Sequence, residues 1–579
     1  MTFRRVLAAV ERYGGALLAD PVGTGKTYVA LAAAAATNGP RPTVCLVPAA
    51  LQDQWRQAAR RTGVPIVPWS HERASRGSLP PHAGRLAIID ESHRLRNPAT
   101  RGYGHVAGWL LGRRTLLLSA TPVVNRLADL AHQLRLAVRD DALAPHGLAS
   151  LGTLLNAGRG HPALGLVVLA TAASSAHRPR AVERAEQVPP TVGDDLEARL
   201  HGIDRLALSP EPQVAALVRC VLWRAAASSP AALVASLRRY RRLLLHARDA
   251  ADAGKRPDRR ALVRLTGGLT DQLLMWELLP GSGDAADLVV DDLPMLESLI
   301  ARAAADTACD DMKLTRLRAL LADGRTTLVF TVARETVRWL RDQLGPRIAW
   351  CTGERAGIGA MRTSRRSAFE WFRAEAAERR KSPAERCFAP EHLVTTDVAA
   401  EGLDLQGAER VVHYDLPWTP MRLDQRRGRV VRAGSLHSEV ELVRFDLPAA
   451  LERRLGHVEL LARKARLPAI VGLDEGGDRW RWRSELAAAF EGFGAERGVA
   501  AVAAEPAGML AGFTLHAWPD AGRAPVAAHV LWWDERSGWT EDPDTLLPRL
   551  DLACRAPPVS VPALAVRVAL ERIGAAVRE

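Results

Sequence analysis

A glycine-containing turn near the start of the chain has the residue types that hold a phosphate chain. It lies in the stretch Leu17-Leu-Ala-Asp-Pro-Val-Gly-Thr-Gly-Lys-Thr27, which reads as an apolar strand, a turn and the start of an alanine-rich helix. Gly23 and Gly25 allow backbone N–H groups to close around phosphate oxygens at the positive end of the helix dipole. Lys26 would reach the β- and γ-phosphates, and the Thr27 hydroxyl would bind magnesium. The alternative interpretation is a glycine turn without a ligand.

Two adjacent carboxylates follow a second apolar strand. The stretch Leu86-Ala-Ile-Ile-Asp-Glu-Ser-His93 places Asp90 and Glu91 at the carboxyl end of that strand, where open α/β sheets bind their ligands. Asp90 would hold magnesium through water, and Glu91 would orient and deprotonate an attacking water molecule. Adjacent acids at a strand end can also cap the next helix, which is the alternative for this stretch taken alone.

Two further stretches complete the set. Ser119-Ala-Thr-Pro122 follows the apolar run Thr115–Leu118, so its hydroxyl groups are expected beside the carboxylates, able to relay between this site and another surface. Gln425-Arg-Arg-Gly-Arg-Val-Val-Arg432 puts Arg429 and Arg432 three residues apart on one face of a predicted helix. Such a pair can stabilise the charge of a transferring phosphoryl group, as arginine fingers do. An exposed basic helix start is the alternative.

These residues need parallel strands to bring them together. Short apolar runs alternate with amphipathic segments in two parts of the chain, which predicts two parallel α/β lobes. The predicted strands are Gly15–Leu18, Val44–Val47, Leu86–Ile89 and Thr115–Leu118 in the first lobe, and Thr327–Thr331, His392–Thr395, Arg410–Tyr414 and Val440–Phe445 in the second. Between the lobes, leucine- and arginine-periodic segments such as Val214–Ala226 and Ala231–Arg248 predict helices.

The predicted domains are a first lobe at 1–145, a linker and helical insertion at 146–308, a second lobe at 309–468 and a small C-terminal α+β domain at 469–579. The last region is rich in tryptophan, and its side chains either form a core or stack on bases or a partner. The tryptophans concerned are Trp480, Trp482, Trp518, Trp532, Trp533 and Trp539.

Composition excludes several classes of protein. The chain has 579 residues, 47% apolar and 25% charged, which excludes a disordered or fibrous chain and predicts several domains. The net charge is +13, and only five of the 78 basic side chains are lysines. Arginine suits phosphate recognition, so this balance indicates either a polyanionic partner or a coding bias toward arginine.

The cysteines and the apolar runs indicate the cellular compartment in which the protein is expected. The six cysteines are scattered without a CxxC pair, which predicts neither a zinc module nor a disulfide framework and fits a reducing cytoplasm. No apolar run approaches the roughly 18 residues of a membrane span. We therefore expect a cytoplasmic protein without a membrane segment.

Taken together, the motifs resemble those of superfamily 2 helicases and translocases, and within them the Swi/Snf-like ATPases, nearest to the bacterial HepA/RapA type. The resemblance covers roughly residues 10 to 465. It rests on seven stretches in the family's order, including an Asp-Glu-Ser-His box: Leu18–Thr27, Val44–Pro48 with Gln54 and Trp55, Asp90–Asn97, Ser119–Asn125, Leu328–Thr331, Val394–Leu405 and Gln425–Arg432. The stretch Val394–Leu405 is closer to the DEAD/DEAH style than to the Swi/Snf style.

The resemblance implies two RecA-like lobes with ATP in the cleft between them and nucleic acid lying across both. The implied ATP and magnesium ligands are Gly23, Thr24, Gly25, Lys26, Thr27, Asp90 and Asp404. The implied catalytic residues are Asp90, Glu91, Gln425, Arg429 and Arg432. Contact with nucleic acid, or coupling of the two sites, is assigned to His93, Ser119, Thr121 and Thr396.

Three functions fit this resemblance. The first is a nucleic-acid-stimulated ATPase that moves along duplex DNA and displaces bound proteins, RNA polymerase among them. The second is a strand-separating DNA or RNA helicase, and the third is an ATP-gated scaffold subunit of a defence or repair complex. The intact set of Lys26, Asp90, Glu91 and Arg429 argues against the third. The helical region 190–305 either grips the duplex or serves as a spacer.

Overall fold

The computed structural model divides into two compact units, Met1–Ser174 with Lys464–Glu579, and Ser175–Arg463. Among the described residues, no helix is both long and apolar enough to cross a membrane. The structure describes residues 2–21, 23–81, 84–170, 179–188, 196–252, 288–306, 311–346, 348–370, 392–397, 405–431, 435, 437–474, 477–478, 484, 501–502, 507–516, 525–540, 542, 545–546, 548–549, 552, 556–560 and 563–576.

The first unit is built on a six-stranded parallel sheet in the order β3-β2-β4-β5-β1-β6. All four strands predicted for this lobe are present, because buried parallel strands read as short continuous apolar runs. The strands are β1 (Gly15–Leu18), β2 (Thr43–Val47), β3 (Ile66–Ser70), β4 (Leu86–Asp90), β5 (Arg114–Leu118) and β6 (Val168–Leu169).

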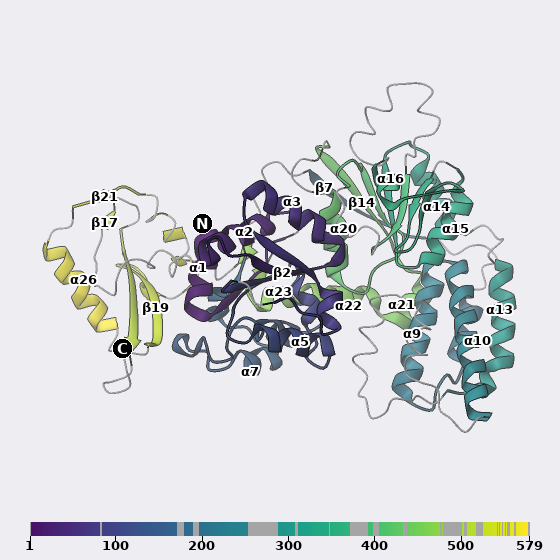
Figure 1. Cartoon of the computed structure of the whole chain (residues 1–579), viewed down its shortest axis with the longest axis horizontal. Coiled ribbons are helices and arrows are strands. Elements are labelled where there is room, and N and C mark those ends of the chain that lie inside the picture. Colours follow the sequence, from purple (N-terminus) through teal and green to yellow (C-terminus); the bar gives the residue numbers. More distant parts are fainter. Residues whose placement is uncertain are drawn as a thin grey trace. The chain divides into compact units, whose positions relative to one another are not determined.

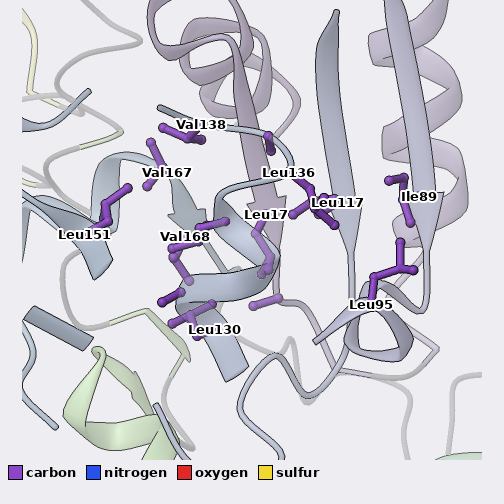
Figure 2. Packing of buried hydrophobic residues seen from close by; sticks show 14 of the residues in the cluster. Leu17, Ile89, Leu95, Leu117, Leu130, Leu136, Val138, Leu151, Val167 and Val168 are labelled. Atoms are coloured by element: carbon purple, nitrogen blue, oxygen red, sulfur yellow. The ribbon is translucent and has the colours of Figure 1, made fainter. Parts of the chain in front are cut away.

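Apolar side chains fill both faces of this sheet. Successive residues of a strand point to opposite faces. Leu17, Ile89 and Leu117 therefore pack in the cluster shown in Figure 2, while their neighbours Leu18 and Ile88 join a second cluster. Helices and short 3-10 segments cover the faces: α1 (Thr2–Tyr13), α2 (Lys26–Asn38), η1 (Ala49–Leu51), α3 (Gln52–Thr62), α4 (His71–Ser75), η2 (Ser92–Leu95), α5 (Arg101–Leu110), α6 (Ala128–Leu134), η3 (Ala144–His146), α7 (Leu151–Asn156) and η4 (Pro162–Leu166).

The second unit contains an eight-stranded sheet in the order β11-β10-β9-β12-β8-β13-β14-β7. Its strands pair in parallel from β9 to β7, and β10 and β11 add an antiparallel edge. The strands are β7 (Arg180–Glu186), β8 (Thr327–Thr331), β9 (Ile348–Cys351), β10 (Ala356–Ile358), β11 (Met361–Thr363), β12 (His392–Thr396), β13 (Arg410–His413) and β14 (Glu439–Phe445).

Helices of the insertion form their own apolar core within the second unit. Figure 1 shows α9, α10 and α13 lying side by side, and leucines from all three pack together with Leu451 of α21. The insertion comprises α8 (Leu196–Asp204), α9 (Pro212–Ser228), α10 (Pro230–Asp252), η5 (Val290–Asp292) and α13 (Leu293–Asp306). The remaining helices are α14 (Met312–Leu321), α15 (Arg334–Leu344), α16 (Arg365–Glu370), α20 (Pro420–Val430), α21 (Ala449–Leu455) and α22 (His457–Ala465).

The C-terminal part contains a three-stranded antiparallel sheet and a helix. The ring of Trp532 is 5% exposed, its indole donates to Asp534 at 3.0 Å, and the Arg572 guanidinium lies 3.8 Å from the Trp533 ring centre. Burial favours the interpretation of Trp532 as a core residue, whereas Trp533 and Trp539 are part-buried, and Trp480, Trp482 and Trp518 lie outside the described residues. The elements are α23 (Leu467–Ile470), β15 (Leu473–Asp474), β16 (Gly477–Asp478), β17 (Ala501–Val502), β18 (Met509–His516), β19 (Pro525–Asp534), β20 (Gly538–Thr540), β21 (Pro558–Val559) and α26 (Ala563–Ala576).

The fold class is confirmed as α/β with two parallel-sheet, RecA-like lobes, while the chain divides differently from the predicted boundaries. Strands β6 and β7 both come from the region 146–308, which the sequence assigns to a linker and helical insertion. β6 completes the first sheet and β7 the edge of the second. In addition, Val471 and Leu473 pack into the core of the first unit, so the chain returns to that unit after the second lobe.

Candidate functional site

The phosphate-loop residues lie between β1 and α2, as their spacing predicts. Gly23 and Gly25 have φ angles of 80° and 89°, in the left-handed region that favours glycine. α2 begins at Lys26, directly after Gly25. The Lys26 ammonium donates to the carbonyl oxygens of Asp20 at 2.5 Å and Pro21 at 2.9 Å. The loop therefore holds its cation at the start of a helix, where backbone N–H groups are without intrahelical partners.

The Thr24 and Thr27 hydroxyls flank this lysine in sequence. The Thr24 hydroxyl donates to the Pro21 carbonyl oxygen at 2.8 Å and so closes the turn. Thr27 is part-buried in the first turn of α2. Its place beside Lys26 is the one that a magnesium-binding hydroxyl takes in this kind of loop.

Asp90 is the last residue of β4, and both oxygens of its carboxylate accept a hydrogen bond. The indole N–H of Trp55 donates to Oδ2 at 2.9 Å, and the backbone N–H of Glu91 donates to Oδ1 at 2.9 Å. Burial raises the pKa of Asp90, and the Trp55 hydrogen bond, the Lys26 charge and the Glu91 N–H each lower it in part. The interaction with Lys26 brings the carboxylate and the phosphate loop into one electrostatic site.

His71 supports the same strand end. Its Nε2 atom lies 2.7 Å from the backbone oxygen of Asp90, and burial lowers the pKa of His71 to about 4. The ring is therefore neutral at pH 7, and Nε2 carries the proton that it donates to the carbonyl. The motif pattern gave no sign of His71, because it follows β3 rather than any of the seven stretches.

Glu91 has a φ of 50°, a conformation that few non-glycine residues adopt. Such backbone strain is concentrated at functional sites, where the surrounding structure supports it. Oε2 of the Glu91 carboxylate lies 3.2 Å from Nδ1 of His93. The same Nδ1 lies 3.2 Å from the Ser119 hydroxyl, which accepts from the Thr121 N–H at 3.2 Å. His93 Nδ1 thus lies between the Glu91 carboxylate and the Ser119 hydroxyl, and it can donate a hydrogen bond to only one of them at a time.

The donor set fits a magnesium ion bound together with phosphates. Magnesium in phosphate sites is held by one or two carboxylates, with phosphate oxygens and water completing its octahedron. Asp90 supplies such a carboxylate at the end of β4, and Thr27 supplies a hydroxyl in the first turn of α2. Within the described residues there is no group of three or more His, Cys, Asp or Glu side chains that would hold a metal without phosphates.

In the second unit, the predicted arginine segment lies on α20. Gln425 and Arg429 stand on this helix, both part-buried, with Arg429 in its last turn. Because α20 ends at Val430, the predicted shared helical face stops short of Arg432, which lies outside the described residues. Asp404 also lies outside them.

Arg426, which motif reasoning did not single out, is the most buried arginine of α20. It is 2% exposed and binds Asp397 through Nε and Nη2, with its Nη1 donating to the Asp415 carbonyl at 3.0 Å. Arg422 adds a second ion pair with Asp397 at 3.3 Å. Burial raises the pKa of Asp397, but the two arginines outweigh it and hold that pKa below its ordinary value. This cluster joins α20 to the end of β12.

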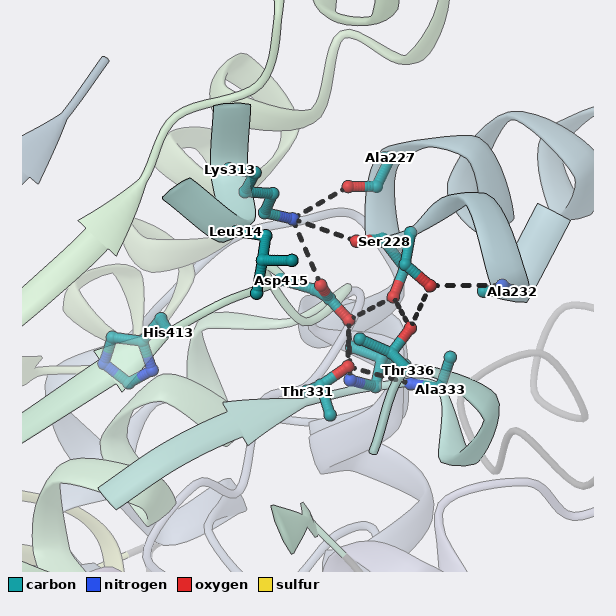
Figure 3. Close-up of polar contacts among 12 residues, drawn as sticks. Ala227, Ser228, Ala232, Lys313, Leu314, Thr331, Ala333, Thr336, His413 and Asp415 are labelled. Carbon is teal, nitrogen blue, oxygen red and sulfur yellow. Dashed lines mark hydrogen bonds and ion pairs between the residues drawn. The ribbon is translucent and has the colours of Figure 1, made fainter. Parts of the chain in front are cut away.

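Asp415 joins the insertion to the second sheet. Figure 3 shows its carboxylate among side chains of three elements: the Ser228 hydroxyl donates to Oδ2 at 2.7 Å, and the Lys313 ammonium lies 3.3 Å from Oδ1. The Thr331 hydroxyl, at the end of β8, also donates to Oδ2. The side chain of Thr336 extends the network to Ser228 at 2.7 Å. The start of α15, the end of α9 and the end of β8 are therefore held together within this unit.

A cavity of about 190 Å³ lies beside this network in the second unit. It is lined by residues at the carboxyl ends of β8 and β12, among them Val332 and Thr396, and by Arg224 of α9. The Arg224 guanidinium lies 5.0 Å from the ring centre of Trp418, and its buried Nη1 has no hydrogen-bond partner among the described residues. Thr396, predicted to contact nucleic acid, thus faces a cavity and is 7% exposed.

Comparison with known proteins gives short matches to helicases. Residues 312–434 match the helicase conserved C-terminal domain. The chain is 50% identical over 42 residues to the uncharacterized ATP-dependent helicase YqhH of Bacillus subtilis (strain 168), which covers 7% of the chain and 8% of that protein. It is 32% identical over 155 residues to the SWI/SNF-related matrix-associated actin-dependent regulator of chromatin subfamily A-like protein 1 of Bos taurus, covering 23% of the chain and 16% of that protein.

A third relative is named as an RNA helicase. The chain is 37% identical over 86 residues to DEAD-box ATP-dependent RNA helicase 53 of Oryza sativa subsp. japonica, covering 15% of the chain and 14% of that protein. The chain thus spans less than a fifth of the length of each of these relatives. Among solved structures, the crystal structure of the Pyrococcus furiosus Hef helicase domain aligns over 77% of this chain and 95% of that one, with 15% identity and a TM-score of 0.36.

The matched range contains strands β8 to β13 of the second sheet and helix α20, and β8, β12 and α20 carry predicted motif residues. Over these segments the chain is therefore similar to ATP-dependent helicases and carries a helicase C-terminal domain match at residues 312–434.

Proposed function

We propose that this protein is a nucleic-acid-stimulated ATPase that translocates along duplex DNA and displaces bound proteins, as Swi/Snf-like enzymes of the HepA/RapA type do. The observation that carries the proposal is the joint placement of Lys26 and Asp90 at the carboxyl edge of the first sheet. Support for the branch comes from the chromatin-regulator relative, the longest of the three matches described above.

In the proposed mechanism, the loop 23–27 holds the phosphate chain of ATP and Glu91 removes the proton from the attacking water. Magnesium bound at Asp90 and Thr27 would neutralise charge on the β- and γ-phosphates. Gln425, Arg429 and Arg432 would complete the site when the two lobes close, with Asp404 toward the nucleotide. Closure would therefore be needed for hydrolysis, which makes the reaction sensitive to bound nucleic acid.

The polar chain from Glu91 through His93 to Ser119 and Thr121 supports the coupling role. A change in the Ser119–Thr121 turn on nucleic-acid binding would reach Glu91 through two short contacts. The proposed partners are the phosphates of nucleic acid, so binding is expected to be independent of sequence and to weaken steeply with salt.

A strand-separating DNA or RNA helicase is the second candidate, and the DEAD-box relative favours it. Strand displacement distinguishes the two. A translocase is expected to hydrolyse ATP on duplex DNA without releasing a labelled strand from a forked duplex. Efficient strand release would contradict the translocase proposal and support the helicase.

The cavity in the second unit supports the proposal that a residue of the insertion contacts the phosphate backbone of the nucleic acid. In the sheet order β9-β12-β8-β13, the chain runs from β8 past β12 to β9, and from β12 past β8 to β13. The connections that follow these two neighbouring strands therefore run in opposite directions. This makes the carboxyl ends of β8 and β12 a topological switch point, where open α/β sheets bind ligands. The cavity lies there, and two of its arginines are committed to carboxylates: Arg239 to Glu335 at 2.7 Å and Arg422 to Asp397. Arg224 has no such ion pair among the described residues, which leaves it for a phosphate oxygen.

Replacing Arg224 with glutamine is expected to weaken duplex-DNA binding about tenfold, the effect of losing one charge-assisted hydrogen bond. The slope of log affinity against log salt should fall by about one, as for one phosphate contact. Fluorescence anisotropy at several salt concentrations measures both. Arg238→Gln, on the exposed side of α10, is the matched control. Equal affinity and slope in the two variants would exclude Arg224 from the interface.

A further inference from the structure

Trp55 is a buried aromatic residue whose indole contacts a residue of the proposed ATP site. It is 1% exposed and packs from α3 into the apolar cluster on one face of the first sheet. An indole nitrogen can only donate, and a buried donor needs an acceptor. The acceptor here is the Asp90 carboxylate, at 2.9 Å.

The two donors on Asp90 act on different oxygens. Trp55 donates to Oδ2, and the Glu91 backbone N–H donates to Oδ1. A carboxylate held at both oxygens cannot rotate about its Cβ–Cγ bond without losing one hydrogen bond. Each carboxylate oxygen has a second lone pair, so these two hydrogen bonds leave acceptor capacity for a metal ion or its water.

We propose that Trp55 is a positioning residue that orients Asp90 for the magnesium ion of the bound nucleotide. The inference rests on the proposed function, because it requires the ATP site to exist. Magnesium demands a nearly ideal octahedron, so a rotated carboxylate is a poor ligand. Hydrogen-bond partners behind a metal ligand typically contribute 10- to 100-fold to metal affinity.

The first unit offers a matched control. Trp109, on α5, is 8% exposed, and its indole donates to the Pro80 carbonyl at 3.0 Å. Trp55→Phe and Trp109→Phe therefore each remove one buried indole hydrogen bond and keep an aromatic ring. They differ in the acceptor, which is the candidate metal ligand in one case and a backbone carbonyl in the other.

The experiment measures binding of a fluorescent ADP analogue to the full chain as magnesium is titrated, with EDTA as the metal-free reference. Trp55→Phe is expected to raise the magnesium concentration at half-saturation by about 10- to 100-fold, with metal-free nucleotide affinity unchanged. Trp109→Phe is expected to match the wild type in the magnesium concentration at half-saturation and in the metal-free nucleotide affinity. If Trp55→Phe does not fold, benzothienylalanine at position 55, which has the indole shape without the N–H, provides the same comparison.

The outcomes separate the two proposals. Wild-type magnesium dependence in the folded Trp55 variant would overturn the positioning role and leave the ATP site intact. Loss of metal-free nucleotide affinity would also overturn it, because it would show general damage to the pocket. A wild-type chain that binds no magnesium nucleotide would overturn the proposed function and this inference with it.

Discussion

Replacement of Glu91 by glutamine is expected to lower ATP hydrolysis by about 10²- to 10⁴-fold, the usual contribution of a positioned general base. Glutamine has the same shape but cannot accept the proton of the attacking water. Glutamine and glutamate have the same size and the same backbone preferences, so the substitution does not add to the cost of the left-handed conformation at position 91. Nucleotide binding should persist, because the Lys26 loop is unchanged.

The measurement combines phosphate release with binding of a fluorescent ATP analogue. Glu72→Gln is the control, since this exposed side chain pairs only loosely with Arg94, at 3.3 Å, on the same unit. Lys26→Ala is expected to lose hydrolysis as well, but through weaker nucleotide binding. Hydrolysis that survives both Glu91→Gln and Lys26→Ala would refute the assignment of the site.

Replacement of Arg426 by methionine is expected to destabilise the second unit by about 3–5 kcal/mol. The substitution leaves the Asp397 carboxylate, whose side chain is 10% exposed, with only the longer Arg422 contact. Removing one partner of a buried ion pair costs this much because the remaining charge is desolvated and unpaired. Differential scanning calorimetry measures the change in the unfolding transition.

The neighbouring residue provides the comparison. Arg427 is 48% exposed and lies 3.5 Å from Glu183, so Arg427→Met is expected to cost less than about 1 kcal/mol. Equal unfolding temperatures for Arg426→Met and Arg427→Met would contradict the structural role of Arg426.

The effect should also depend on pH. The folded pKa of Asp397 lies below its ordinary value, so the ion pair stabilises the wild type above that ordinary value and the stabilisation is lost as the pH falls further. In Arg426→Met, protonation of Asp397 relieves the buried charge. The difference in stability between the two proteins should therefore shrink below about pH 4. A difference that is constant from pH 7 to pH 3 would exclude the charge of Asp397 as the cause.

Most of the central strands were predictable because each is a short, mainly apolar run, whereas the interior strand β9 and the edge elements were not predicted. β7, Arg180-Ala-Val-Glu-Arg-Ala-Glu186, carries mostly part-buried or exposed residues, and charged side chains of this kind are typical of strands at a sheet edge. β6 has only two residues and is recognisable only through its pairing with β1. The sequence of the region between the lobes therefore predicts a linker and helices, without these two strands.

The positions of Lys26 and Asp90 relative to the strands were predictable, because each stands at a motif position directly after an apolar run. Their roles in an ATP site stay a prediction. Arg426 was missed because, in a chain so rich in arginine, residue type does not reveal which guanidinium is buried. Trp55 stood out only as part of a motif, since its bond to Asp90 depends on how α3 packs on the sheet.

The most direct test of the central claim is ATP hydrolysis by the purified chain without nucleic acid and with single-stranded DNA, duplex DNA or RNA. The proposed function predicts slow hydrolysis alone and strong stimulation by duplex DNA that weakens as salt rises. Stimulation by RNA or single strands alone would transfer the proposal to the helicase alternative. Hydrolysis that is absent throughout, or unaffected by every nucleic acid, would contradict the account.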